Sequence, residues 1–292
     1  MRIVYFGTPD FAVEPLKALV DNGYDVCAVV TREDKPKGRG YELQPSAVKQ
    51  EALKHNIPVL HPIKMKDESF INQLKAYNAD LFVVVAYGRI LPKMILDLPS
   101  MGCINVHASL LPSYRGAAPI QWAVIDGLTE TGVTTMLMDE GLDTGDILKQ
   151  YKLTLSEDET GGSLFDKLAV LGGESLIDTL KALEAGNITP TKQGDTDTEY
   201  ARMLTKEDGN IDWSKSAAEI ERLVRGLNPW PSAYTKLNDK TLKIWKARVS
   251  DTGDDGNPLC FKTGEGYLIA EEVQLEGKKR MDAKTFLLGY KK

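Results

Sequence analysis

Cysteine is scarce in this 292-residue sequence, which holds only Cys27, Cys103 and Cys260. The three are far apart and form no CxxC pair, so they indicate neither a disulfide framework nor a zinc or redox motif. Cys27 and Cys103 lie in apolar, strand-like stretches. We therefore expect buried thiols in a reducing compartment, because a chain of this length can bury a core without disulfides or metals.

Long apolar segments are also lacking. The longest apolar run, residues 81–87, is far shorter than the roughly 20 residues that cross a membrane. Residues 1–7 (MRIVYFG) contain no apolar core of the kind found in signal peptides. These features predict a cytoplasmic protein without a membrane partner.

The motifs of several common cofactors are missing. The first predicted strand ends in FGTP at residues 6–9 rather than in GxGxxG, which argues against a nicotinamide fingerprint. The sequence has no Walker-type phosphate loop, and no HExxH motif or carboxylate cluster indicates a metal. We therefore expect no metal cofactor.

A strong charge of one sign is absent as well. The sequence has 36 basic and 42 acidic residues, a formal charge of −6, which excludes a uniformly basic nucleic-acid binder. The charge is unevenly distributed, however. Residues 206–292 carry 16 basic and 14 acidic residues, whereas the other 205 residues carry 20 and 28. The C-terminal part is therefore mildly basic, and the acidity belongs to the part before it.

Strands and helices alternate through the first 190 or so residues. This order predicts an α/β fold with a doubly wound, parallel, Rossmann-like sheet, whose sites lie at the carboxyl ends of the strands. The predicted strands are 2–6, 25–31, 57–60, 81–86, 103–106 and 132–138, and the predicted helices are 15–22, 47–56, 67–77, 119–126 and 160–185.

The composition changes after this region. Residues 190–205 contain little apolar sequence at their start and are typical of a linker. Beyond them, one helix at 217–226 precedes short strands at 233–237, 241–249 and 266–273 and from 274 onward. Short strands separated by turn clusters indicate a small, OB-like β-barrel. We expect a catalytic domain at 1–189, a linker at 190–205 and a barrel domain at 206–292.

Asn105 and His107 form the most informative polar pair. They alternate along a predicted strand, so their side chains share one face while Val106 points to the other. An amide donor beside an imidazole suits a reaction at a carbonyl group, because the amide can stabilise a developing oxyanion and the imidazole can move protons. Taken alone, the pair also fits a polar strand end that caps neighbouring backbone.

Two following motifs support the chemical interpretation. SLLPSYRG at 109–116 comes directly after His107, and MDEGLDTGD at 138–146 follows another predicted strand. Glycine and aspartate clusters are usually turns. Here the turn lies at a strand end, so a carboxylate in it could meet the imidazole, orient it or take up a proton from an attacking amine.

At these residues the sequence resembles the 10-formyltetrahydrofolate-dependent formyltransferases. The resemblance rests on Asn105, His107, the SLLPSYRG run and Asp143 in GLDTGD. It continues through DGNIDW at 208–213, RGLNPWP at 225–231 and GKKRM at 277–281, which are similar to the C-terminal domain of the methionyl-tRNA formyltransferases. Ser232 departs from the pattern, since many members have glycine there, and it affects only local turn geometry.

The resemblance implies transfer of a formyl group from 10-formyltetrahydrofolate to the α-amine of methionyl-initiator tRNA, by a monomer, with Asn105, His107 and Asp143 as catalytic residues. It places the folate against two segments near the strand ends. The residues implied are Ser109, Leu110, Leu111 and Pro112, together with Ala86, Tyr87, Gly88 and Ile90.

Because tRNA is a polyanion, the implied tRNA partner should contact local groups of basic side chains. The run KPKGRGY at 35–41 has three cations, two glycines and a tyrosine, which suits phosphate contact and base stacking, although such a run can also be a solvated loop. The resemblance implies that Arg39 of this run reaches the acceptor end. Charge and region give the tRNA-binding candidates Lys35, Lys37, Arg39, Lys206, Arg225, Lys243, Lys246, Lys278, Lys279 and Arg280.

Three alternatives remain open on the sequence. A formyltransferase acting on a sugar nucleotide would share the catalytic motifs, but the basic run and the tRNA-type C-terminal domain argue against it. A non-catalytic RNA- or folate-binding module should have lost part of the catalytic set, which is complete here. A hydrolase releasing formate would turn over without an amine acceptor.

Overall fold

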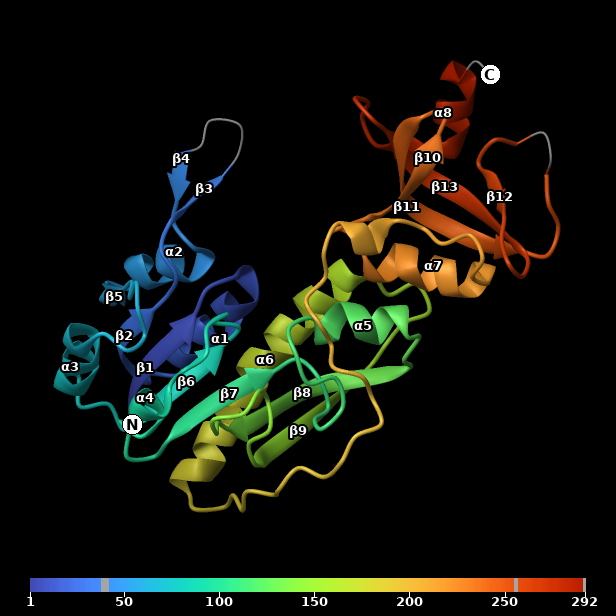
Figure 1. Cartoon of the computed structure of the whole chain (residues 1–292). Helices are drawn as coiled ribbons and strands as arrows, with labels where there is room; N and C mark the ends of the chain where they lie inside the picture. Colours follow the sequence, from blue (N-terminus) through green and yellow to red (C-terminus); the bar gives the residue numbers. More distant parts are fainter. Residues whose placement is uncertain (38–41, 255–256, 291–292) are drawn as a thin grey trace. The chain divides into compact units, whose positions relative to one another are not determined.

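The computed structural model describes residues 1–37, 42–254 and 257–290. The chain forms two compact units (Figure 1). Unit 1 comprises residues 1–115, 131–153 and 165–200, and unit 2 comprises residues 116–130, 154–164 and 201–292. The sequence division at residues 189 and 205 stays a prediction.

A seven-stranded sheet forms the centre of unit 1, in the order β5-β2-β1-β6-β7-β8-β9 (Figure 1). Along the chain the strands are β1 (Arg2–Gly7), β2 (Asp25–Val30), β5 (Val59–Leu60), β6 (Leu81–Val85), β7 (Cys103–His107), β8 (Glu130–Leu137) and β9 (Ile147–Thr154). The first five pair in parallel. The run LFVVV of β6 is buried throughout, because a parallel strand is covered on both faces.

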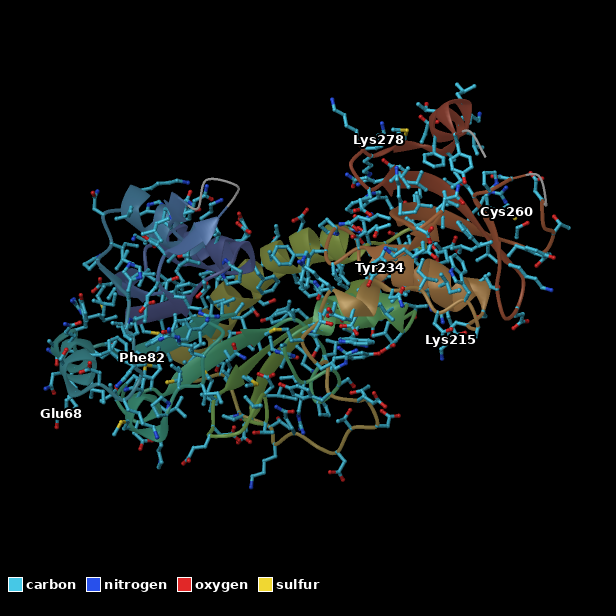
Figure 2. The ribbon with its side chains drawn as sticks, turned by 45° about the horizontal axis from the view of Figure 1, so that its top comes forward. Glu68, Phe82, Lys215, Tyr234, Cys260 and Lys278 are labelled. Atoms are coloured by element: carbon cyan, nitrogen blue, oxygen red, sulfur yellow. The ribbon has the colours of Figure 1, made fainter. Side chains whose placement is uncertain are left out.

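Helices cover both faces of this sheet, as expected for a doubly wound fold. On one face Phe82 packs with Phe70 and other residues of α3, and Figure 2 shows Phe82 inside the unit and Glu68 of α3 at its surface. On the other face, a Cβ on Gly172 of α6 would lie 3.4 Å from Cγ1 of Val106 in β7. The helices concerned are α1 (Val13–Asp21), α2 (Ala47–Lys54), α3 (Glu68–Ala76), α4 (Lys93–Leu96) and α6 (Gly161–Glu184), with a short 3-10 helix η1 (Asp10–Ala12) before α1.

The sheet is mixed rather than wholly parallel, and this corrects one expectation. β8 pairs antiparallel with β7, with Leu137 opposite Ile104 and Thr134 opposite His107. The end of β8 therefore lies beside the start of β7, not beside the carboxyl ends of the parallel strands. β9, which the sequence did not predict, pairs with β8 at the sheet edge.

The long polar segment after β2 contains a short hairpin. Its strands are β3 (Lys35–Lys37) and β4 (Glu42–Gln44), and Pro36 pairs with Leu43. Lys35 and Lys37 thus lie on β3, whereas Arg39 lies outside the described residues.

Unit 2 contains a curled antiparallel sheet, in the order β10-β11-β13-β12 with β14 paired to β13, which forms a half-barrel. Its core joins Leu242, Ile244 and Leu268 to Ile220 and Val224 of α7. The elements are α5 (Pro119–Ile125), η2 (Glu207–Gly209), α7 (Ala217–Gly226), β10 (Ala233–Leu237), β11 (Lys240–Ser250), β12 (Cys260–Lys262), β13 (Tyr267–Leu275), β14 (Met281–Asp282) and α8 (Ala283–Gly289).

Local sequence explains two features of unit 2. Ser216 and Glu219 form a reciprocal capping box at the start of α7. Ser232 is buried and has φ +71°, a left-handed conformation that glycine adopts more readily, which agrees with the turn effect expected at this position. Within the described part of the chain, none of the helices is long and apolar enough to span a membrane.

Candidate active site

Strand β7 brings Asn105 and His107 to one face of the sheet. Both side chains are largely buried, with 9% and 6% of their surfaces exposed, while Val106 faces α6 on the opposite side. The prediction that the two polar residues share a face is therefore confirmed. A strand buried on both sides also holds them more rigidly than a loop would.

Asp143 comes to this pair from the loop 138–146. Asn105 Nδ2 lies 3.4 Å from Asp143 Oδ1, and His107 Nδ1 lies 3.8 Å from Asp143 Oδ2. Because β8 is antiparallel, this loop starts beside Cys103, where the N–H of Met138 donates to the Cys103 carbonyl. The loop must therefore fold back along β7 to place the carboxylate at Asn105 and His107.

The hydrogen bond of His107 to Tyr114 fixes the protonation pattern of the ring. His107 Nε2 lies 3.0 Å from the Tyr114 carbonyl oxygen. A carbonyl oxygen only accepts, so we assign the hydrogen of the neutral ring to Nε2. Nδ1, which faces Asp143, is then the nitrogen that can take up and release a proton.

The loop 138–146 has a defined internal structure. The Asp139 carboxylate accepts hydrogen bonds from the N–H of Gly141 (3.0 Å) and the hydroxyl of Thr144 (2.8 Å). A Cβ on Gly145 would lie only 1.8 Å from the Leu137 carbonyl oxygen, so glycine is required for this close approach. Asp143 itself has φ +56°. The turn residues of GLDTGD thus set the direction of the Asp143 side chain.

The segment 109–112, implied to contact folate, is tied to β8 and β9. The hydroxyl of Thr134 donates to the Ser109 carbonyl (2.7 Å) and accepts from the N–H of Leu111 (3.0 Å). Gln150 Nε2 donates to the Leu111 carbonyl (2.7 Å). Ser109 and Leu111 are buried, Leu110 is half-buried, and the bond between Leu111 and Pro112 is cis.

The loop 86–90 lies directly after β6, beside β7. Val84 of β6 pairs with Asn105, so the residues that follow β6 emerge next to the candidate site. Ala86 and Gly88 have φ values of +45° and +75°, while Tyr87 is buried between them and burial raises its pKa to about 12. Ile90 is 68% exposed.

Sequence reasoning missed three residues near the site. Gln193 and Arg115 hydrogen-bond to each other, and Gln193 also binds the loop 138–146. Tyr200 lies near enough to Asp143 for its pKa to rise, first through partial burial and then through the carboxylate charge. Gln193 and Tyr200 lie within residues 190–205, which were interpreted as a linker. Arg115 belongs to SLLPSYRG but was given no role.

The candidate tRNA-binding cations of unit 2, which were chosen by charge and region, differ in their surroundings. Lys206, Lys278 and Lys279 are exposed, and Figure 2 shows Lys278 at the turn between β13 and β14. The Arg280 guanidinium lies 4.7 Å from the centre of the Trp245 ring, and the Lys243 ammonium lies 5.5 Å from it. This arrangement places two cations over one aromatic ring.

Lys246, Arg225 and also Arg280 are paired within unit 2. Lys246 pairs with Glu271 at 3.2 Å, and Arg280 makes two short contacts with Glu272. Arg225 donates to Glu221 (2.6 Å) and to the Glu159 carbonyl (2.8 Å). Arg225 therefore holds two segments of unit 2 together, while its contact with RNA stays a prediction.

Metal ligands are not clustered in the part of the chain that the structure describes. Among residues 1–37, 42–254 and 257–290, no group of three His, Cys, Asp or Glu side chains could hold a metal ion.

Comparison with known proteins identifies the family of this chain. Residues 1–180 match the formyl transferase family model, and residues 203–291 match the model of the formyl transferase C-terminal domain. The methionyl-tRNA formyltransferase of Lachnospira eligens is 56% identical over 99% of this chain and 96% of its own length. The enzyme of the same name from Clostridioides difficile is 49% identical over 99% of this chain and 97% of its own length.

Solved structures share the fold at lower identity. The sugar 3N-formyl transferase WlaRD, determined with dTDP and 5-N-formyl-THF, has a TM-score of 0.70 and 20% identity, covering 96% of this chain and 99% of its own. HypX from Aquifex aeolicus, determined with tetrahydrofolic acid, has a TM-score of 0.67 and 16% identity, covering 98% of this chain and 47% of its own. With both domain models matched in order along the sequence, the chain belongs to the formyl transferase family.

Proposed function

We propose that this chain transfers the formyl group of 10-formyltetrahydrofolate to the α-amine of methionyl-initiator tRNA, at a site made by Asn105, His107 and Asp143. The transfer serves translation initiation. The observation that carries the site assignment is the meeting of these three side chains, with Asn105 and His107 at 3.4 and 3.8 Å from the Asp143 carboxylate. Full-length identity of 56% to a methionyl-tRNA formyltransferase supports the choice of acceptor.

The reaction needs a donor of hydrogen bonds and an acceptor of a proton. When a neutral amine attacks the formyl carbon, negative charge develops on the formyl oxygen and positive charge on the amine nitrogen. The Asn105 amide N–H can stabilise the oxygen, since a fixed donor in a buried site costs no reorganisation. His107 Nδ1 can accept the amine proton, because Nε2 already carries a hydrogen that is bonded to the Tyr114 carbonyl.

Asp143 supports His107 in this scheme. A carboxylate at 3.8 Å from Nδ1 stabilises the ring once that nitrogen has been protonated, so the proton is held while the transfer is completed. The protonated ring can then donate to the oxygen of the reacting group or release the proton to the departing nitrogen. Asn105 and His107 thus act on the oxygen and the proton, and Asp143 acts through the imidazole.

The two segments implied to bind folate fit a flat heteroaromatic ring. The backbone at Ala86 and Gly88 turns sharply at the end of β6, beside Asn105. Exposed Ile90 and half-buried Leu110 provide apolar surface on either segment. The folate supplies the formyl group when it is bound, and the backbone of 86–88 and 109–112 would hold its polar edge.

Transfer of formyl groups by this chain is tested directly with purified enzyme and 10-formyltetrahydrofolate. We expect formylation of charged initiator methionyl-tRNA and little formylation of charged elongator methionyl-tRNA. If the enzyme formylated an amino-sugar nucleotide in preference to methionyl-tRNA, the proposed acceptor would be wrong. Release of formate without an amine acceptor would indicate a hydrolase, and binding without turnover would indicate a module that has lost catalysis.

The proposal includes a cytoplasmic monomer as the working form. The proposed acceptor is a substrate of translation, which supports a cytoplasmic location. Light scattering of the purified chain should give a mass near 32.2 kDa, and a stable dimer would contradict the monomer.

A further inference from the structure

The side chain of Gln193 lies between Arg115 and the loop that carries Asp143. We propose that Gln193 is a positioning residue for the formyl transfer, which holds the backbone at Asp143 so that the carboxylate meets His107. The proposal rests on the function given above for Asp143 and adds a residue from the stretch that the sequence indicated to be a linker.

All hydrogen-bonding positions of the Gln193 amide are used. Its oxygen accepts from Arg115 Nε (2.9 Å) and Nη2 (2.7 Å). Its nitrogen donates to the carbonyl oxygens of Asp143 (2.8 Å) and Gly145 (2.7 Å). An amide offers two lone pairs and two N–H groups, so the side chain is saturated. A carboxylate of the same length could keep the Arg115 contacts but could not donate to the two carbonyls.

The contacts of the Asp143 carboxylate with its partners make this backbone support important. The carboxylate lies 3.4 Å from Asn105 Nδ2 and 3.8 Å from His107 Nδ1, so a small shift of the loop would separate these groups. The backbone conformation, with φ +56° at Asp143, sets the direction in which this side chain leaves the loop. Gln193 binds the carbonyl of that same residue and the carbonyl two positions later.

The segment around Gln193 is itself anchored, so it can serve as a support. Thr191 and Ile147 exchange two backbone hydrogen bonds of 2.8 Å, next to the loop. Thr198 accepts from the N–H of Tyr114 at 2.9 Å, and Tyr114 is the residue whose carbonyl accepts from His107. Residues 191–198 thus contact the backbone beside the Asp143 loop and the backbone of Tyr114, which accepts a hydrogen bond from His107.

Loss of the Gln193 amide should weaken catalysis more than binding. A displacement of about 1 Å in a reacting group can cost on the order of 10²-fold in rate. Gln193 donates to backbone beneath the site, so its removal should change the position of Asp143 without removing a substrate contact. The effect should therefore fall on kcat and leave KM for both substrates nearly unchanged.

The test compares Gln193→Leu, Gln193→Glu and the neighbouring exposed-residue control Lys192→Leu in full-length enzyme. With 10-formyltetrahydrofolate and methionyl-tRNA, we expect kcat to fall about 10- to 100-fold in both Gln193 variants. KM for each substrate should stay within about threefold of the wild-type value, and Lys192→Leu should match wild type. Thermal melting establishes that each variant is folded, and Gln193→Glu keeps the size of the side chain and its contacts with Arg115.

Two results would overturn the inference. If Gln193→Glu kept wild-type kcat, the residue would only anchor its segment to Arg115. If the loss appeared in KM alone, Gln193 would act on substrate binding rather than on Asp143. Failure of the proposed function is a separate outcome, because it appears as wild-type enzyme that does not formylate methionyl-tRNA at all.

Discussion

Asn105 and Asp143 lie 38 residues apart in the sequence, yet Nδ2 of the one is 3.4 Å from Oδ1 of the other. The contact joins a buried strand to a glycine-rich loop that returns along it. His107 meets the same carboxylate from the same face of β7. A rigid strand therefore supplies the amide and the imidazole, and the loop supplies the charge.

Removal of either strand residue should abolish most of the turnover. Because loss of an oxyanion donor costs about 10²–10³ in rate and a positioned proton acceptor contributes about 10²–10⁴, we expect Asn105→Ala and His107→Ala each to lose at least about 10²-fold in kcat. Each replacement leaves the surrounding β7 backbone pairs in place, so the fold should persist. Formyl transfer and thermal melting measured on the same samples check this prediction. Near-normal turnover in a folded variant would remove that residue from the mechanism.

Neutralising Asp143 should slow the reaction while the loop 138–146 keeps its conformation. Asp143→Asn keeps the shape of the side chain but removes the charge that stabilises protonated His107, so we expect kcat to fall by about 10²-fold or more. Glu140→Gln, at an exposed position of the same loop, is the matched control and should behave as wild type. A fall of less than about threefold in Asp143→Asn would show that the charge is not needed.

Replacement of Arg39 should weaken the binding of tRNA but not the binding of folate. Arg39→Ala removes one phosphate contact of the implied kind, so we expect weaker tRNA binding and a salt dependence whose slope falls by about one, with unchanged folate affinity. Lys75→Ala, at an exposed position of α3, controls for net charge. Binding of charged initiator tRNA at several salt concentrations provides the measurement. An unaltered affinity and slope would contradict the role of Arg39.

Asp208 should make the stability of the protein depend on pH. Hydrogen bonds from Arg202 and from the N–H and hydroxyl of Thr205 lower the pKa of Asp208, with Arg202 the main cause. Asp208→Asn should reduce the free energy of unfolding by about 2 kcal/mol at pH 7.

The pH dependence follows from the direction of that shift. A carboxyl group whose pKa is lowered by folding contributes its stability above its unfolded pKa of about 4, and loses it as pH falls through the folded value. The difference between wild type and Asp208→Asn should therefore shrink below pH of about 4. Urea unfolding across pH checks this, with exposed Asp251→Asn as control. A difference independent of pH would contradict it.

Periodicity and turn chemistry predicted much of unit 1 because they act locally. Apolar runs identified β1, β2, β6 and β7, and helix signals identified α1, α2, α3 and α6 close to their observed bounds. β9 and α8 were missed, since β9 alternates half-buried and exposed residues at the sheet edge and α8 is short. The antiparallel pairing of β8 could not be read from a strand–helix order that usually signals parallel pairing.

The sequence by itself determined which chemistry is available, because an amide, an imidazole and a carboxylate occur in motifs whose spacing is local. It also placed Asn105 and His107 on one face, since side chains alternate along any strand. Only the tertiary structure decided how Asp143 reaches them, because the return of its loop depends on the antiparallel direction of β8. The same holds for Gln193, whose hydrogen bonds to Arg115, Asp143 and Gly145 join residues 48 to 78 positions away, a separation that no local pattern records.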